Sequence, residues 1–113
     1  AVERPPFLCP RPGGIEAAHV RWHGHGGADQ VDNGLALCSL HHTLFDLGVL
    51  GVTGEGRVRV SPRFVGTSEA ARAQVHVLEG QLLRNRQSGR PGPDPANVGW
   101  HTSEVFKSVP VAA

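Results

Sequence analysis

The chain has 113 residues, of which 39% are hydrophobic and 19% are charged, and its formal net charge at pH 7 is +1. This length allows one small domain, and the composition fits a soluble globular protein. No apolar run approaches the length of a membrane span and no secretory signal is visible, so we expect a cytoplasmic protein without a membrane partner. Because the chain begins with Ala1 and contains no Met, we interpret it as a processed chain or a fragment of a longer protein.

The first third of the chain predicts two short strands joined by a loop. Residues 1–14 are rich in Pro and Gly and predict irregular chain. Residues 15–22 are mostly apolar and predict a strand, and the short apolar run 35–37 predicts a second. Between them, the polar and Gly-rich sequence of residues 23–33 indicates a loop, in which glycines can adopt positive φ.

A helix and a hairpin are expected next. Ser39 is placed to cap a short helix that runs through His42 and ends at Gly48. Two apolar runs, residues 49–52 and 58–60, then flank the sequence Thr-Gly-Glu-Gly. A Gly-containing turn between two such runs is typical of a β-hairpin.

The spacing of apolar residues predicts a longer helix over residues 67–88, opened by Thr67 or Ser68. Its apolar face would consist of Ala71, Val75, Leu78 and Leu82.

Residues 89–113 are expected to form a linker and a tail, because their first part is rich in Pro, Gly and polar residues. Trp100 and His101 could face a ligand, but we expect them to dock the tail on the core.

Charge is distributed unevenly along the chain. Residues 26–56 contain four acidic residues and no Lys or Arg, whereas residues 57–90 contain seven Arg against two Glu. This pattern suits a site that holds a cation beside a flank that meets phosphates. The alternative is that the arginines are simply solvated surface residues of a helix and a hairpin.

Three residues of the central segment form a chemically suggestive set: His19 on the first strand, Asn33 after the loop and His42 on the short helix. Packing the helix across the two strands would bring the two histidines to one cleft. A histidine can act as a general base near pH 7 or bind a divalent cation, and phosphodiester hydrolysis uses both functions. The Asn33 amide can donate and accept, so it can fix a loop.

Four short motifs occur in order at 17–20 (AAHV), 26–29 (GGAD), 33–37 (NGLAL) and 42–48 (HTLFDLG). Together they make the segment 15–53 resemble the HNH endonuclease family, in particular the restriction-type branch. The resemblance implies an α+β fold in which residues 1–113 form one domain, with a ββα-metal core, an added hairpin and a C-terminal helix. It also implies that His19 is the general base, that Asn33 positions the loop and that His42 binds the catalytic metal.

The implied activity is divalent-metal-dependent hydrolysis of DNA phosphodiesters, with Mg²⁺, Mn²⁺ or another transition metal as cofactor. DNA would be bound mainly through its phosphates, and a homodimer is left open. In restriction relatives a separate module reads methylated or phosphorothioated DNA, so a recognition domain is expected elsewhere in the full-length protein. The alternative is a catalytically inactive HNH-like module that binds zinc or nucleic acid.

One position departs from the family pattern. Many HNH proteins carry an Asp or His before the general base, as a second metal ligand, but this chain has Ala18. The cation would then bind His42, waters and the phosphate, with His19 or Asp46 as the further protein ligand. We therefore expect weak metal binding in the absence of DNA.

A second metal site is suggested by Cys9, Cys38 and His41, a set that could bind a structural zinc. Structural zinc takes four ligands, so the fourth would be missing or would come from His23, His25 or residues outside the chain. Otherwise these two histidines belong to a solvated loop, Cys38 is a small buried residue and Cys9 is a free thiol. Two cysteines do not make a disulfide framework.

Overall fold

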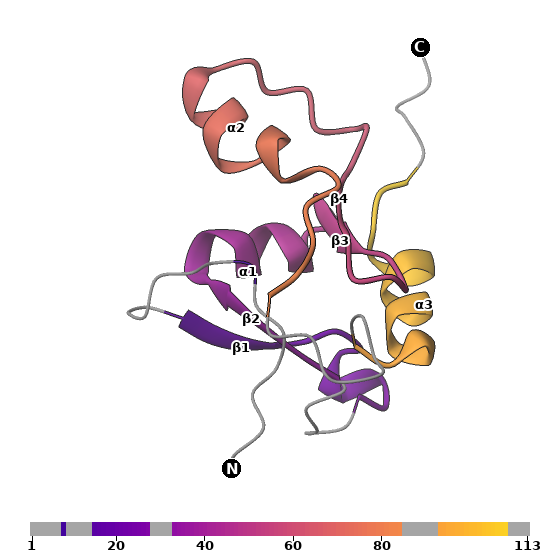
Figure 1. The fold of residues 1–113 in the computed structure, drawn as a ribbon. Helices are drawn as coiled ribbons and strands as arrows, with labels where there is room; N and C mark the ends of the chain where they lie inside the picture. Colours follow the sequence, from indigo (N-terminus) through magenta and orange to yellow (C-terminus); the bar gives the residue numbers. More distant parts are fainter. Residues whose placement is uncertain (1–7, 9–14, 28–32, 85–92, 109–113) are drawn as a thin grey trace.

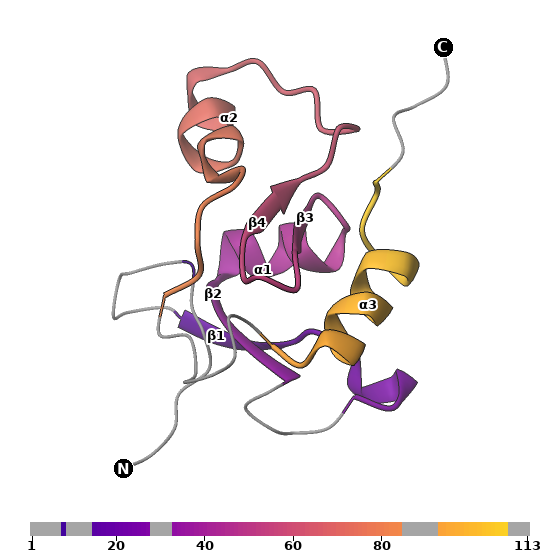
Figure 2. The same ribbon diagram turned by 45° about the vertical axis from the view of Figure 1, so that its right-hand side comes forward.

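The computed structural model describes residues 8, 15–27, 33–84 and 93–108. Two antiparallel hairpins form separate two-stranded sheets, and helix α1 (Ser39–Asp46) contacts both of them (Figures 1 and 2). The first sheet pairs β1 (Ile15–His19) with β2 (Gly34–Cys38), and the second pairs β3 (Leu50–Val52) with β4 (Val58–Val60). The order β1, β2, α1 gives the expected ββα core in an α+β fold with an additional hairpin.

The first hairpin presents one apolar face to α1. Ala18 lies opposite Leu35 and Glu16 lies opposite Leu37, so these four residues share a face of the sheet. Ala18, Leu35 and Leu37 are almost fully buried, as is Phe45 of α1. The core continues into the second hairpin and the helices through Val20, Leu50, Val52, Val58, Val75, Leu78, Leu83 and Val98.

The short helix α1 forms where it was expected, but its first turn differs from the prediction. The N-cap is Cys38 and its side chain makes no capping hydrogen bond, so Ser39 is the first helical residue and not the cap. Gly48 ends the helix as predicted, with φ +82°. A Cβ at this position would lie 2.1 Å from the carbonyl oxygen of Val105, so close packing as well as positive φ requires glycine.

The helix predicted over 67–88 is wrong in its extent. Ser68 caps it by accepting a hydrogen bond from the Ala71 amide, but α2 ends at Gln74 (Glu69–Gln74) and only the short 3-10 helix η3 (His76–Leu78) follows.

After η3 the chain pairs with the second hairpin. The Val58 amide donates to Gln81 and the Leu83 amide donates to Gly56, each at 2.8 Å. This extended backbone buries Leu83 and leaves Leu82, assigned to the apolar helix face, 42% exposed. Residues 85–88 lie outside the described residues.

The prediction of a linker and tail over 89–113 missed helix α3 (Pro95–Glu104). Asp94 caps this helix by accepting a hydrogen bond from the Ala96 amide at 2.8 Å, and Pro95 occupies its first turn. Residues 89–92 and 109–113 lie outside the described residues. Among the described residues, every helix is too short or too polar to cross a membrane.

The expected docking of the tail on the core is confirmed for His101. Its ring is fully buried and stacks on Phe45, with centroids 3.7 Å apart and planes 8° from parallel. His101 Nε2 donates to the carbonyl oxygen of Phe45 at 2.9 Å, and the Lys107 amide donates to the Gly48 carbonyl at 3.0 Å. These contacts attach α3 and its C-terminal extension to the end of α1.

Stability should fall in acid because of His101. Burial lowers its pKa from 6.5 to about 4, opposed by the hydrogen bond to Phe45. As pH falls, His101 therefore binds a proton in the unfolded chain before it does so in the folded chain. The contribution is present above pH 6.5 and is lost as pH falls through about 4. We expect the free energy of unfolding, measured by urea titration across this range, to fall by about 3 kcal/mol from this group.

The control is His101→Phe, which keeps an aromatic ring against Phe45 but removes the ionisable group. At neutral pH the free energy of unfolding of this variant should be about 1 kcal/mol lower, because the hydrogen bond to Phe45 is lost. Its free energy of unfolding should also fall less steeply as pH is lowered. Equal acid dependence in the two proteins would contradict the assignment.

Candidate functional site

Asn33 ties together the two ends of the loop that joins β1 and β2. Its side chain accepts a hydrogen bond from the Arg21 amide at 2.8 Å and donates one to the Arg21 carbonyl at 2.9 Å. The Val20 amide donates to the Asn33 carbonyl at 3.0 Å. The residue is 1% exposed, so these bonds satisfy polar groups that water does not reach. Asn33 thus acts as a clamp, which is the geometry expected of a loop-positioning residue.

The glycines of the loop serve two different purposes. Gly26 adopts φ +88°, as the sequence suggested. Gly27 instead permits close approach, because a Cβ there would lie 1.7 Å from the Arg21 carbonyl oxygen and 2.9 Å from Asn33 Nδ2. Only glycine fits between the clamp and the returning chain.

His42 lies between two carboxylates. Its Nδ1 is 2.7 Å from Glu16 Oε1 on β1, and its Nε2 is 3.3 Å from Asp46 Oδ2 one turn along α1. The imidazole is 28% exposed and the two carboxylates more so, which leaves the group accessible from solvent.

This arrangement can orient the imidazole of His42 and leave one of its nitrogens available to a cation. A carboxylate only accepts hydrogen bonds, so Nδ1 donates to Glu16 and the Nε2 lone pair can point toward Asp46. Two facing acceptors favour a metal cation between them. A histidine oriented by a carboxylate on one nitrogen, with the other nitrogen available, is a common arrangement of metal-binding histidines. Within the described parts of the chain, however, no group of three or more His, Cys, Asp or Glu side chains converges on one point.

Asp46 is tied to the rest of the site by its neighbours. Partial burial raises the pKa of its carboxyl group, and the charge of His42 and a hydrogen bond with the Trp22 side chain lower it. The contact with Trp22 links the helix to the loop that follows β1.

His19 is the last residue of β1 and pairs with Gly34, which has no side chain to cover it. Adjacent strand residues point to opposite faces, so His19 leaves the strand on the face opposite to Ala18. Its ring lies edge-on to that of His23, with centroids 5.8 Å apart. The structure thus places His42 with Glu16 and Asp46, and a shared cleft for the two histidines stays a prediction.

Cys38 and His41 face each other as the zinc hypothesis requires of two ligands. The Sγ atom of Cys38 lies 3.3 Å from His41 Nδ1. His41 Nε2 donates to the Gln74 carbonyl at 2.8 Å, which leaves Nδ1 to face the sulfur. The third proposed ligand, Cys9, lies outside the described residues.

Residues 4–53 match the family model of the HNH endonuclease. This segment is therefore similar to the HNH endonuclease family, as its motifs suggested. Among solved structures, the chain is similar to a modification dependent TagI restriction endonuclease, with 26% sequence identity and a TM-score of 0.53. The match covers 80% of this chain but only 27% of that protein. No curated protein matches the chain.

Two residues near the proposed metal-binding histidine, Glu16 and Trp22, were not predicted from the sequence. Glu16 stands in a strand whose other residues are apolar or His, and it shares the parity of Ala18, so it faces α1. That parity was the available signal for a partner of His42. Trp22 carried no spacing signal, since its contact with Asp46 depends on how the HNH loop folds.

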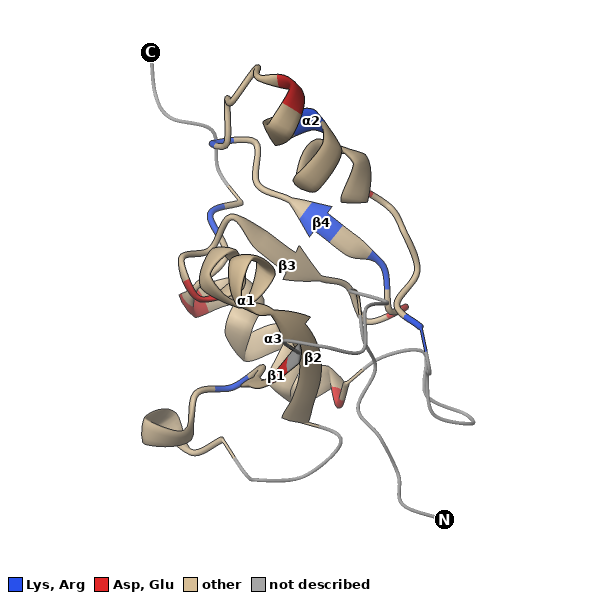
Figure 3. Ribbon diagram, turned by 90° about the vertical axis from the view of Figure 1, so that its left-hand side faces the viewer, with Lys and Arg blue, Asp and Glu red and all other residues tan. Residues whose placement is uncertain are grey.

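The arginine-rich part that follows the HNH motif is partly used inside the protein. Arg57 donates to the Gly80 carbonyl at 2.8 Å, and the Arg59 guanidinium lies 4.9 Å from the centre of the Phe106 ring. Figure 3 shows the basic residues spread along β4 and the neighbouring segments. These two arginines thus make contacts within the protein, and phosphate binding by the arginine-rich part stays a prediction.

Replacing the clamp should destabilise the fold. Asn33→Ala leaves the amide and the carbonyl of Arg21 without partners, so we expect a loss of about 2–4 kcal/mol in the free energy of unfolding. Asn33→Asp should also be destabilised, because it sets an oxygen against the Arg21 carbonyl. The exposed amide of Gln81, which donates to the Val77 carbonyl, is the matched control, and Gln81→Ala should change stability by less than about 0.5 kcal/mol. Equal effects of Asn33→Ala and Gln81→Ala would contradict the clamp.

Proposed function

We propose that this chain is the cleavage module of a restriction enzyme, a divalent-metal-dependent endonuclease that hydrolyses DNA phosphodiesters. The observation that carries the proposal is the position of His42 between Glu16 and Asp46, within a segment that is similar to the HNH endonuclease family. An imidazole oriented by one carboxylate and adjoined by another suits a divalent cation.

The proposed roles follow from what each side chain can do. Glu16 orients the ring of His42 through Nδ1, and His42 and Asp46 would hold a divalent cation. Asn33 holds the loop, and His19, at the open end of β1, takes a proton from the attacking water. A divalent cation here would stabilise the negative charge that grows on the phosphate.

Because Ala18 carries no carboxylate or imidazole, the protein ligands of a metal would come from α1. Ala18 is buried against the core and offers no ligand. Asp46 is then the carboxylate nearest to the metal-binding nitrogen, and the remaining positions would be filled by water and a phosphate of the substrate. This supports the expectation that the metal binds weakly until DNA is present.

The setting of the module is also part of the proposal. The similar solved protein is a modification dependent restriction endonuclease, and this chain spans about 27% of its length. We infer that recognition of modified DNA resides in another domain of a larger protein, that this module meets DNA mainly through phosphates, and that the protein works in the cytoplasm. A homodimer would allow both strands to be cut.

For zinc, we propose that Cys38 and His41 are two ligands of a structural site that Cys9 completes in part. The hydrogen bond from His41 to Gln74 supports this, since it fixes the ring with Nδ1 toward the sulfur. Such a site would join the end of β2 to α2.

Nicking of supercoiled plasmid tests the proposed activity. With Mg²⁺, Mn²⁺, Co²⁺ or Ni²⁺ the chain should nick, and His19→Ala should lower the rate by about 10²–10⁴-fold because the general base is lost. His42→Ala should also lower it. His76→Gln, which keeps a donor toward Gly66, should not.

The outcomes separate the alternatives. Equal nicking by His19→Ala and the parent chain would remove His19 as the base. No nicking by the parent chain with any of the four metals would favour the inactive binding module.

Metal analysis of the purified protein tests the zinc site. We expect stoichiometric zinc in the parent chain and its loss in Cys38→Ser, because a structural site needs its thiolates. Val77→Ala, an exposed substitution elsewhere, should keep the metal. A parent chain without stoichiometric zinc would contradict the site.

A further inference from the structure

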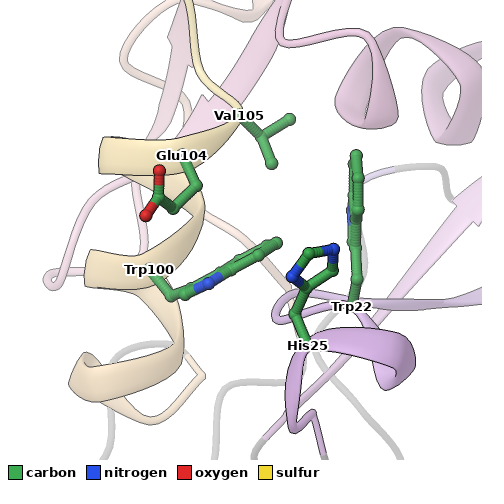
Figure 4. A pocket seen from close by; sticks show the side chains of 5 residues that line it. All are labelled: Trp22, His25, Trp100, Glu104 and Val105. Atoms are coloured by element: carbon green, nitrogen blue, oxygen red, sulfur yellow. The ribbon is translucent and has the colours of Figure 1, made fainter.

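A small aromatic pocket lies where the loop after β1 meets α3 (Figure 4). It has a volume of about 260 Å³ and is lined by Trp22, His25, Trp100, Glu104 and Val105. The two indole rings are 5.6 Å apart and inclined by 62°, with the His25 ring against both. Trp22 is 36% exposed, so a large aromatic surface faces solvent here. Neither the fold nor the roles proposed above use this surface.

The pocket is connected to the proposed metal-binding residue. The Trp22 side chain makes a hydrogen bond with Asp46, and Asp46 lies 3.3 Å from His42 Nε2. The indole of Trp22 thus adjoins, through its N–H group, the residues that would hold the cleaved phosphate. The same ring also lines the pocket. A nucleotide bound at that phosphate would have its base within reach of the indole.

We propose that the pocket binds a nucleobase of the cleaved DNA strand, unpaired or turned out of the duplex, by stacking on Trp22 and Trp100. The inference rests on the proposed function, because it assumes that DNA is the substrate. Aromatic side chains stack on bases irrespective of sequence, and enzymes turn nucleotides out of the duplex into such pockets.

The lining favours a base over other parts of DNA. Among the described residues, no Lys or Arg lines the pocket, and the carboxylate of Glu104 does line it, so a phosphate would be repelled. A carboxylate does accept hydrogen bonds from the N–H groups on a base edge. The volume lies just below the range of pockets for drug-sized ligands, which suits one planar ring system.

Intrinsic fluorescence gives a direct test, since both tryptophans of the chain line this pocket and the chain has no Tyr. Without metal, a short single-stranded oligodeoxycytidylate should quench the emission, whereas an abasic oligomer of the same length should not. Trp100→Leu should weaken oligodeoxycytidylate binding by about 5- to 150-fold, measured by anisotropy of labelled DNA. Val77→Ala, an exposed apolar residue outside the pocket, should leave it unchanged.

Fluorescence and binding test the pocket, whereas plasmid nicking tests the proposed activity, so each can fail without the other. Quenching by oligodeoxycytidylate but not by the abasic oligomer supports the pocket even if no metal supports nicking, a result that would contradict the activity alone. Plasmid nicking together with equal binding of the two oligomers and unchanged emission would overturn the pocket alone. The comparison of oligomers on the parent chain holds even if Trp100→Leu fails to fold.

Discussion

The stacked contact between Phe45 and His101 is the interaction on which the rest of this small structure depends. It joins α1 to α3 across a separation of 56 residues, and the carbonyl of Phe45 accepts the hydrogen bond from the His101 ring. On its other side, α1 packs on the buried face of the first hairpin. Helix α1 has only eight residues, too few to be stable alone in water, so its position is set by these tertiary contacts.

The chemistry of the candidate site follows from that constraint. His42 and Asp46 are one turn apart on α1 and therefore share a face, while Glu16 reaches the same imidazole from β1. A helix held on two sides can present these groups in a fixed arrangement although they are partly exposed. The site thus gains its order from the apolar contacts behind it.

Sequence reasoning succeeded where the determining signals were local. The two hairpins and the end of α1 at Gly48 followed from turn residues and short apolar runs. It failed over 67–88, because hydrogen bonds between Leu83 and the distant Gly56 replaced a helix that spacing alone favoured. It missed α3 since the Pro- and Gly-rich sequence before Asp94 outweighed the cap signal. Strand parity places Glu16 on the face toward α1, but its pairing with His42, 26 residues away, depends on tertiary packing.

The clamp made by Asn33 also bears on how this module can vary. Because both backbone groups of Arg21 are bound to Asn33, the chain is fixed on either side of the loop. A change of length between Gly27 and Asn33 would then be absorbed within the loop and would not shift the register of β1 and β2. Doubling such a loop costs only about 0.6 kcal/mol in closure entropy. Insertions can therefore accumulate between these two positions while the hairpin and the residues that it carries stay where they are.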